Sequence, residues 1–405
     1  MTNSSPIKGL TTKEKLVATS ILEAEPTIVT TSDFTHGELV INFGSTEGSR
    51  AGAWERALRQ TLPIFRNAPV VGINVPEKDT DDQRFIGEDQ AATNGEGLLM
   101  AVGGGDGTVN RAAIRAGKIG ATLMIGGYGN GNNAALMYNG RKHCRNPEKM
   151  LQEGLAVVRT VRLMEMLVAY EQDGQMIEES HLALTSMGYG AVAAEADGLE
   201  AARVTYSHRI QWLRKIREYR QAAKSARAIL NGGVSYRIQP IDSNGKEIHS
   251  GPEEGPDTYP HKLIVTHDWC RGFMTKYVYL PRERWSDHQA HRLDLERPEL
   301  LHEWIHGIQT ATHPTTPLSG QPEHIITLDP MCGYVDGEPF QIPAGSKVTV
   351  RMSDMTVNIL ARNKVDLYPP KIPIRAHLVG LMARMPTPEQ AQFYLKAFLN
   401  PRLKH

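Results

Sequence analysis

Short runs of apolar residues alternate with segments of helical apolar spacing through the first part of the chain. Such runs predict buried strands, and apolar residues three or four positions apart predict helices packed on them. The expected strands cover 39–43, 70–75, 98–102 and 121–125, and the expected helices cover 54–65 and 109–116. Because strands that alternate with helices are typical of a parallel sheet, we predict a Rossmann-like, doubly wound α/β domain over 37–158, after an extension over 1–36.

Near Thr160 the pattern changes to closely spaced apolar runs with few helical segments between them. These runs predict strands over 161–170, 182–187, 234–238, 262–266, 325–328, 347–352 and 356–360. Many strands with few helices indicate an antiparallel β-sandwich or flattened barrel, which we place over 159–368. A tail over 369–405 contains a predicted helix that we expect to pack back on the first domain.

The clearest sign of chemistry is the stretch G-G-G-D-G-T-V-N at 103–110, which directly follows a predicted strand. Glycines permit positive φ and a close approach of the backbone to a ligand. Exposed N–H groups at such a turn, with a helix N-terminus behind them, suit phosphate groups. An acid within an anion-binding loop, here Asp106, makes sense if a cation or a reacting hydroxyl is also present. The stretch predicts a nucleotide with Mg²⁺ and phosphoryl transfer; the alternative is a tight strand–helix turn without a ligand.

Two further stretches can contribute to the same site. The second glycine cluster, I-G-G-Y-G-N-G-N-N at 125–133, also follows a predicted strand, so the two clusters can face one cleft, with Asn130 bonded to a nucleotide. An ordinary Gly-Asn turn is the alternative. Near the C-terminus, Y-V-D-G-E-P at 334–339 is typical of a hairpin turn. Its two acids, Asp336 and Glu338, can nevertheless share a site, one as proton acceptor and the other as metal ligand or as the group that orients the base.

Composition narrows the class of protein. Lys and Arg together equal Asp and Glu at 45 each, so no overall field favours nucleic acid. The 3 cysteines are widely spaced, which favours a reducing cytoplasm over a disulfide framework or a cysteine zinc site. The polar N-terminus is unlike a signal peptide, and no apolar run is long enough for a transmembrane helix. We therefore expect a cytoplasmic protein whose membrane contact, where it occurs, is peripheral.

Taken together, the three stretches resemble the diacylglycerol kinase and sphingosine kinase superfamily of lipid kinases, particularly its soluble bacterial members. The nucleotide loop of that family, G-G-D-G-T-x-N-E, is matched in order from Gly104 to Asn110, and its late D-G-E is matched by Asp336 to Glu338. Looser matches are N-P-x-S-G at 42–45, G-T-G-N-D-F-A from 127 onward, and G-[FY]-D-A at 188–191. The resemblance spans 38–365 in order and spacing.

The resemblance implies an active site in the cleft between the two domains, ATP and Mg²⁺ as cofactors, and a lipid hydroxyl, such as that of diacylglycerol, as acceptor. It implies that Asp336 is the general base, that Asp106 acts near the metal and the γ-phosphate, and that Glu338 is a second metal ligand. The implied nucleotide-binding residues are Asn42, Ser45, Gly103, Gly104, Gly105, Asp106, Gly107, Thr108, Asn110, Gly127, Tyr128, Gly129 and Asn130. The implied substrate-binding residues are Gly188 and Tyr189.

The chain departs from the family pattern at several of these motifs. Phe43 stands in place of proline, Arg111 in place of glutamate, and Tyr128 in place of threonine. Gly131 and Gly190 each stand where the family has aspartate. These changes are compatible with a different acceptor or with weakened catalysis.

Other functions fit parts of the sequence. An NAD kinase shares G-G-D-G-T, but the G-x-x-G-F segment and the N-D pair of that family are missing, and the late D-G-E favours a lipid acceptor. A nucleotide-binding regulatory protein descended from the kinases is a further alternative. H-E-W-I-H at 302–306 fits a zinc hydrolase, although that function would leave the glycine clusters unexplained. A basic amphipathic stretch over 203–227 fits either a surface helix or contact with anionic lipid.

Overall fold

The computed structural model describes the chain in several stretches. Backbone and side chains are described for 27–45, 47–71, 94–129, 131–190, 238–246 and 322–363, and for Ala193 and Asp197, with Gly72 and Ile73 and the short strands between 262 and 317 described by backbone alone. The predicted helix of the tail, the basic stretch over 203–227 and the H-E-W-I-H segment lie outside the described residues. The domain limits remain predictions.

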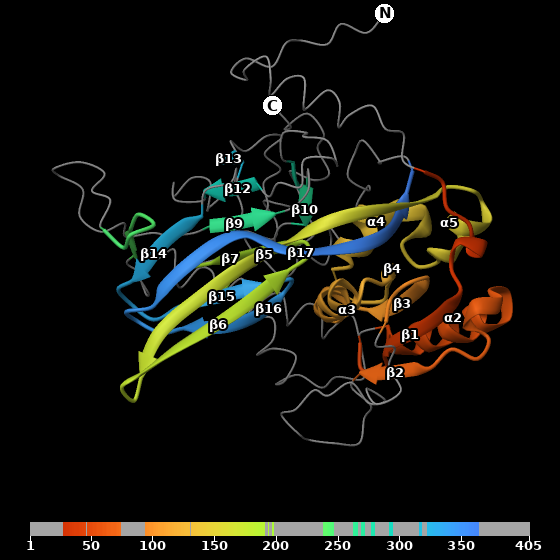
Figure 1. Ribbon diagram of the computed structural model, residues 1–405, viewed down its shortest axis with the longest axis horizontal. Coiled ribbons are helices and arrows are strands. Elements are labelled where there is room, and N and C mark those ends of the chain that lie inside the picture. Colours follow the sequence, from red (N-terminus) through yellow and green to blue (C-terminus); the bar gives the residue numbers. More distant parts are fainter. Residues whose placement is uncertain are drawn as a thin grey trace, which may run out of the picture.

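The α/β half of the molecule is built on four parallel strands, β1 (His36–Asn42), β2 (Val70–Ile73), β3 (Leu98–Gly104) and β4 (Thr122–Gly127), in the order β2-β1-β3-β4 (Figure 1). Its helices are α2 (Gly48–Thr61), α3 (Asp106–Ile119), α4 (Asn133–His143) and α5 (Glu148–Gln152), with single 3₁₀ turns η1 (Thr31–Asp33) and η2 (Pro63–Phe65). The prediction of parallel strands with helices between them is confirmed. In such a sheet ligands bind outside the carboxyl ends of the strands where the strand order reverses, here between β1 and β3.

Helix α2 begins well before the predicted start at Trp54, and it ends at Thr61 rather than continuing to Phe65. The early start was missed because Gly48, Ser49 and Arg50 lack the apolar spacing of a helix. The early end follows from Pro63, which cannot continue the hydrogen-bonding pattern and instead opens the 3₁₀ turn η2.

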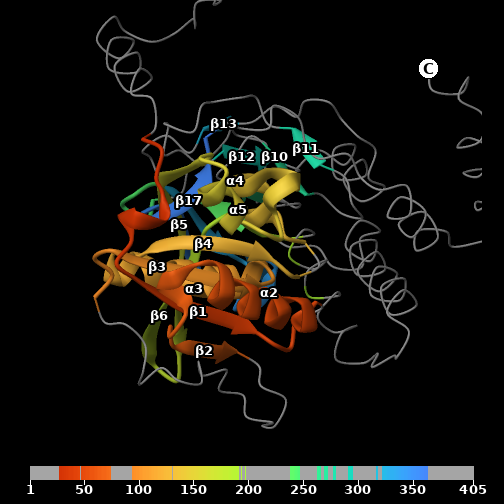
Figure 2. The same ribbon diagram turned by 90° about the vertical axis from the view of Figure 1, so that its right-hand side faces the viewer.

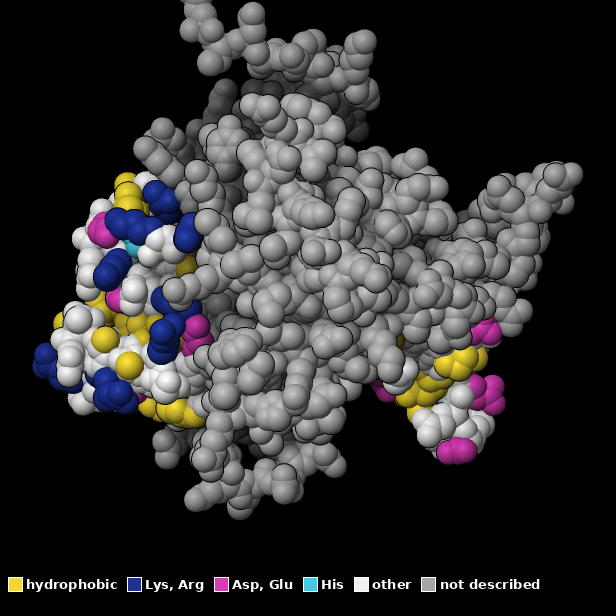
Figure 3. Space-filling view, turned by 180° about the vertical axis from the view of Figure 1, so that it is seen from behind, with side chains coloured by type: hydrophobic (Ala, Val, Ile, Leu, Met, Phe, Trp, Pro, Cys, Tyr) yellow, Lys and Arg dark blue, Asp and Glu magenta, His cyan; other side chains and the backbone are white. Residues whose placement is uncertain are grey.

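Both faces of the parallel strands are covered. Alternate residues of each strand point to opposite faces, so Leu39 and Ile41 of β1 pack with α2, whereas Val40 packs with α3 and α4. Figure 2 shows α2 in front of the strands, and α4 and α5 on the same side of the molecule. Charged side chains cover much of the outer surface of this half (Figure 3). A buried ion pair fixes α3 to the sheet, because Arg115 donates to both carboxylate oxygens of Glu38 in β1.

Two long strands continue this sheet into the β half. Strand β17 (Lys347–Arg362) pairs in parallel with β4 through Asn358 and Ile359, and it pairs in antiparallel fashion with β5 (Ala156–Gln172) along nearly its whole length. The result is a 9-stranded sheet that also includes β6 (Gln175–Ala183), β8 (Ile238–Pro240) and β14 (Glu323–Thr327). The two halves therefore share backbone hydrogen bonds rather than a flexible linker.

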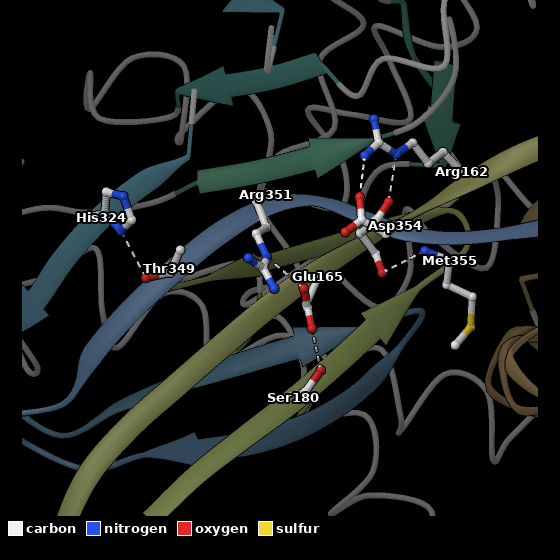
Figure 4. Close-up of polar contacts among 9 residues, drawn as sticks. Arg162, Glu165, Ser180, His324, Thr349, Arg351, Asp354 and Met355 are labelled. Atoms are coloured by element: carbon white, nitrogen blue, oxygen red, sulfur yellow. Dashed lines mark hydrogen bonds and ion pairs between the residues drawn. The ribbon is translucent and has the colours of Figure 1, made fainter. Parts of the chain in front are cut away.

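The two strands predicted over 347–352 and 356–360 are one strand, β17, with an irregularity between Met352 and Thr356. The polar pair at 353–354 lies between the two predicted strands, and its groups are satisfied locally. Arg162 of β5 donates to the Ser353 carbonyl at 2.7 Å and to the Asp354 carboxylate at 2.9 Å. Figure 4 shows these contacts beside a second polar set, in which Glu165 joins Arg351 to Ser180. Side-chain contacts thus hold the bulge in place.

A second sheet completes the β half. Its 6 strands follow the order β13-β12-β9-β7-β15-β16, and all of its pairs are antiparallel. The strands are β7 (Ser186–Tyr189), β9 (Lys262–Val265), β12 (His291–Asp294), β13 (Thr316–Pro317), β15 (Met331–Val335) and β16 (Glu338–Ile342); a separate pair joins β10 (Trp269–Arg271) to β11 (Tyr277–Tyr279). Strand β15 lies against β6, and β7 lies against β5, so the two sheets face each other as the predicted sandwich.

One predicted strand, 182–187, is divided in two. Strand β6 ends at Ala183 and β7 begins at Ser186, so the chain passes from one sheet to the other at Leu184 and Thr185. Among the described residues, no helix has both the length and the apolar character required to cross a bilayer.

Candidate active site

The site is built where β1 and β3 end and α3 begins. Asn42, the last residue of β1, donates its Nδ2 hydrogen to Thr108 Oγ1 at 2.7 Å, and this bond is buried. Thr108 lies in the first turn of α3, whose N-cap is Gly105. The bond joins the ends of the two strands across the position where ligands bind in doubly wound sheets. Asn42 and Thr108 are 66 positions apart in the sequence, so the sequence alone does not reveal this contact.

The two glycine clusters are in direct contact. A Cβ on Gly129 would overlap the Cα of Gly105, so only glycine fits at Gly129. The Tyr128 N–H donates to the Gly104 carbonyl at 2.9 Å, which holds the second turn on the first. The prediction that both clusters face one site is therefore supported by their packing.

The backbone N–H groups of residues 127–129 in the second turn all donate to other groups of the protein. Gly127 donates to the Cys144 carbonyl at 2.8 Å, and Gly129 donates to Asn132 Oδ1 at 2.7 Å. Asn132 itself has a φ of 56°, in the left-handed region that asparagine tolerates. Asn130, the predicted nucleotide ligand of this turn, lies outside the described residues. The described part of the turn is thus a rigid support for the first turn.

The Tyr128 side chain is packed in the core and is not exposed in an open loop. Its ring lies 5.5 Å from that of Trp54 between centroids, and its hydroxyl donates to the Arg145 carbonyl. Only 3% of the residue is exposed, and this burial raises the pKa of the Tyr128 hydroxyl well above its usual range. A tyrosine at this position therefore anchors the second glycine turn to α2 and to the segment after α4.

Asp106 opens α3, and its carboxylate reaches toward the start of α4. Its Oδ1 accepts the Ala134 N–H at 3.1 Å. A Cβ on Gly131 would overlap its Oδ2. Glycine at position 131 therefore makes room for the Asp106 carboxylate, and the N-terminus of α4 favours the charge on it. This gives a physical reason for one of the departures from the family pattern.

Asp336 and Gly337 form the turn of the β15–β16 hairpin. Their φ values are 45° and 87°, as in the two-residue turns with positive φ at both positions that join twisted strands. The hairpin interpretation of D-G is thus confirmed. The turn directs the Asp336 side chain inward, where the residue is only 3% exposed.

The buried carboxylate of Asp336 is held by the segment between β6 and β7. Its Oδ2 accepts the Leu184 N–H at 2.7 Å, and its Oδ1 accepts the N–H groups of Thr185 at 2.9 Å and Ser186 at 2.8 Å, with the Thr185 hydroxyl as a further donor. Burial raises the pKa of Asp336 to about 6, although these hydrogen bonds favour the charged form. The carboxylate therefore titrates close to neutral pH.

Asn110 joins α3 to this same segment. Its Nδ2 donates to the Leu182 carbonyl at 2.7 Å, and its Oδ1 accepts the Leu184 N–H at 3.1 Å. Asn110 was predicted to bind nucleotide. Both of its polar side-chain atoms instead contact the backbone of the β half, so its described role is to position α3 against the Asp336 turn.

Glu338 lies against the first turn of α3. A Cβ on Gly107 would come within 2.8 Å of Glu338 Cδ, so the close approach requires glycine at that position. Arg111 donates from Nη2 to the two Glu338 oxygens at 3.0 Å and 3.2 Å. The two side chains are 30% and 44% exposed, which makes this an ion pair open to solvent between the two halves. Sequence comparison identified Arg111 as a departure but gave no partner for it.

Gly188 and Tyr189, the predicted substrate residues, lie in β7 of the second sheet. Tyr189 is fully buried, and its hydroxyl donates to Glu323 at 2.9 Å. Gly188 pairs with Tyr334 in β15. Gly190 has a φ of 80°, which explains glycine where the family has aspartate, and its N–H donates to the Cys332 carbonyl at 3.1 Å. In the described structure these residues build the sheet behind the Asp336 turn.

Four polar side-chain atoms around the glycine turns are buried and have no hydrogen-bond partner among the described residues. They are Asn42 Oδ1, Ser45 Oγ, Glu47 Oε2 and Asn133 Oδ1. Buried polar atoms are nearly always paired, so these atoms beside a helix N-terminus mark a place where a ligand or water can supply the partners. Asn133 was not predicted, although the asparagine run of the second cluster contained the signal. No group of three or more acidic, histidine or cysteine side chains is arranged for a metal in the described part of the chain.

Comparisons with known proteins give similar folds at low identity. No family model and no curated protein matches the sequence. Among solved structures, a diacylglycerol kinase from Bacillus anthracis str. Sterne is 13% identical with a TM-score of 0.45, over 81% of this chain and 97% of that chain. Yeast NADH kinase in complex with NADH is 10% identical with a TM-score of 0.37, over 81% of this chain and 83% of that chain. Likeness at this level does not carry an assignment of activity, which has to come from the site residues.

Proposed function

We propose that this protein is a phosphotransferase that moves the γ-phosphate of ATP to the hydroxyl of a lipid such as diacylglycerol. One observation carries the proposal: both acid-bearing motifs meet on α3. Asp106 opens the helix, Glu338 lies on Gly107, and Asp336 lies behind Leu184, which Asn110 of the same helix also contacts. An ordinary strand–helix turn has no need of acids drawn in from a distant hairpin.

The nucleotide phosphates fit the first turn of α3. The N–H groups of that turn have no partners within the helix, and the helix dipole favours negative charge there. On the β1 side of the turn, the Ser45 hydroxyl is buried and has no partner among the described residues, so it can donate to a phosphate oxygen. The N–H groups of residues 127–129 in the second turn already have partners, so the backbone donors proposed for phosphate are those of α3.

Mg²⁺ fits the same place. This ion prefers one or two carboxylates together with phosphate oxygens and water. Asp106 would hold it. The buried side-chain amide oxygen of Asn133 lies two residues after Gly131, against which the Asp106 carboxylate lies. Glu338 is a second candidate ligand once Arg111 releases it. When bound, the ion would neutralise charge on the transferring phosphate.

Asp336 is the proposed general base. With a pKa of about 6 it is largely ionised at neutral pH and still basic enough to accept a hydroxyl proton. Three of its donors are backbone N–H groups, which are fixed, whereas the fourth is the Thr185 hydroxyl, which can rotate away. The hydroxyl of the acceptor would take the place of the Thr185 hydroxyl.

The test is transfer of label from γ-labelled MgATP into a total lipid extract. Wild-type protein is compared with Asp106→Asn and Asp336→Asn, each checked for folding by circular dichroism. A labelled lipid that is lost with both folded variants supports the proposal and identifies the acceptor. ATP binding without any labelled lipid would contradict it. A parallel reaction with NAD and with soluble alcohols then decides whether the acceptor is a small molecule.

A further inference from the structure

One side of the α/β half carries a concentration of positive charge. Helices α2 and α5 pack on one face of the sheet and α4 on the other, but the start of α2, the end of α4 and α5 meet at the end of this half that faces the viewer in Figure 2. Lys and Arg side chains also gather over the α/β half in the view from behind (Figure 3). Six exposed residues of these helices and their links, which we call the basic face, are Arg50, Arg56, Arg141, Lys142, Arg145 and Lys149. Since the whole chain has a net charge of zero, this is a local asymmetry.

The acids of the same elements do little to cancel it. Glu148 is 7% exposed and accepts a hydrogen bond from Trp54 Nε1, while Glu55 pairs with Arg59 along α2. Glu47 has a side chain only 18% exposed and is shared by two members of the basic face. Glu153 pairs with Lys142, whose side chain is still 64% exposed. Most of this negative charge is turned inward, whereas the cations point outward.

The contacts of Glu47 join the basic face to the candidate active site. Its Oε1 lies 2.7 Å from Arg145 and 3.4 Å from Arg50, which brings the start of α2 together with the segment after α4. Its backbone N–H donates to the Tyr128 carbonyl in the second glycine turn at 3.1 Å. A surface bound to this face would therefore lie beside the glycine turns.

An aromatic side chain is exposed on the same side. Phe43 is 42% exposed and is one of the few large apolar side chains in the described residues with this exposure. A Cβ on Gly52 would lie 3.5 Å from the Phe43 ring and 3.9 Å from Arg56, so ring and guanidinium flank the same position of α2. Phe43 follows Asn42, whose side chain enters the site. Exposed aromatic and basic side chains together are typical of proteins that bind at a membrane interface.

We propose that the basic face and Phe43 form the surface on which this protein docks to an anionic lipid bilayer. The cations would contact lipid phosphates, and the Phe43 ring would enter the boundary between headgroups and acyl chains. This inference rests on the proposed function, because docking at this face brings a membrane-bound acceptor beside the nucleotide site. Attraction to lipid phosphates falls off within a Debye length, so the binding must weaken as salt increases.

Vesicle flotation tests the surface without requiring any catalysis. The full chain is mixed with vesicles of phosphatidylcholine alone, or of phosphatidylcholine with phosphatidylglycerol, at low and at high salt. The expected result is flotation with the anionic vesicles only, reduced by salt. The double variant Arg56→Glu/Lys149→Glu should partition at least tenfold more weakly, since each charge lost weakens partitioning by about fivefold. The matched control, Lys246→Glu/Lys347→Glu, reverses two exposed charges of the β half and should float as the wild type does.

Other results would overturn the inference. Equal binding to both kinds of vesicle would do so, as would equal loss in the two double variants. Tighter binding of a DNA or RNA oligonucleotide than of vesicles at the same salt, lost in Arg56→Glu/Lys149→Glu, would mean a nucleic-acid surface. Loss of ATP affinity in Phe43→Ala with flotation unchanged would place the ring in the nucleotide site instead.

The same variants separate this inference from the proposed function. If the protein is a lipid kinase docked by this face, Arg56→Glu/Lys149→Glu should lower transfer to diacylglycerol in anionic vesicles and leave transfer to a soluble short-chain diacylglycerol unchanged. Flotation without phosphoryl transfer would leave the docking surface standing and contradict only the kinase. Transfer in vesicles that is insensitive to the double variant would leave the kinase standing and contradict only the surface.

Discussion

The side chains of Asn110 and Asp336 accept the same backbone N–H, that of Leu184, at 3.1 Å and 2.7 Å. Asn110 belongs to α3 in the α/β half, and Asp336 belongs to the hairpin turn of the β half. The N–H between them lies where the chain crosses from β6 to β7. The helix that carries the glycine turn and the proposed base thus share one peptide group, beside the contacts of Asn110 with Leu182 and of Arg111 with Glu338.

Asn110→Ala should therefore destabilise the protein and loosen the position of α3 relative to the base. The substitution leaves the Leu182 carbonyl without its donor in a largely buried position, which costs about 1–3 kcal/mol. Because Asp336 keeps its own donors, its carboxylate should remain in place but with a less defined distance to α3. We expect a lower urea midpoint and a lower kcat, with little change in the affinity for ATP. A loss of ATP affinity alone would instead mean that Asn110 binds the nucleotide.

The pH dependence of stability should carry the signature of Asp336. Its pKa is about 6 in the folded protein, against an ordinary value of 3.8. Between these values the folded state binds more protons than the unfolded state, so stability falls as the pH rises through this window and levels off above it. The shift corresponds to at most about 3 kcal/mol. Urea unfolding measured from about pH 4 to 7 should show this decline in the wild type and not in Asp336→Asn.

Activity should follow the opposite course in the same window. If Asp336 accepts the proton of the acceptor hydroxyl, kcat/KM rises as the pH passes about 6, where the carboxylate ionises. Asp336→Asn should lower kcat by about 10²–10⁴-fold and leave the Kd for ATP unchanged. A variant that retained the acidic limb of the pH profile would assign that limb to another group.

Gly131→Ala tests the proposed position of the Asp106 carboxylate. The added Cβ would overlap Asp106 Oδ2, so the carboxylate must move. A displacement of about 1 Å near reacting groups lowers turnover by on the order of a hundredfold. The matched control is Gly52→Ala, whose Cβ would have nothing nearer than 3.5 Å and should leave turnover unchanged. Equal activity in the two variants would mean that the carboxylate does not work from this position.

The sequence was informative where one local rule decides the structure. Apolar runs located the strands of the α/β half, and the glycine spacing located the turn at α3. The D-G pair located a hairpin, because positive φ at two successive residues restricts the choice of side chains. Sequence reasoning failed where contacts between residues far apart in the sequence decide the structure. The split between β6 and β7 depends on an acceptor at Asp336, and the continuation of β17 through its bulge depends on Arg162 across the sheet.

Site roles were harder to predict for the same reason. Asn110 and Tyr128 stand at motif positions, yet their described contacts are with backbone N–H and carbonyl groups and core side chains of neighbouring elements. A motif records which residue types recur and does not distinguish a side chain that touches the ligand from one that holds the loop. The four buried atoms near the glycine turns that have no partner among the described residues became visible only in the folded structure.

The ion pair between Arg111 and Glu338 yields a last prediction about the metal. Because both side chains are partly exposed, Arg111→Ala should change the free energy of unfolding by no more than about 1 kcal/mol. The same change removes the cation that occupies both oxygens of Glu338, so the carboxylate becomes available against Gly107, the residue that follows Asp106. We expect half-maximal activity at a lower Mg²⁺ concentration in Arg111→Ala than in the wild type, and no such gain in Arg111→Ala/Glu338→Gln. If both variants need the same Mg²⁺ concentration as the wild type, Glu338 takes no part in binding the metal and Arg111 only joins the two halves.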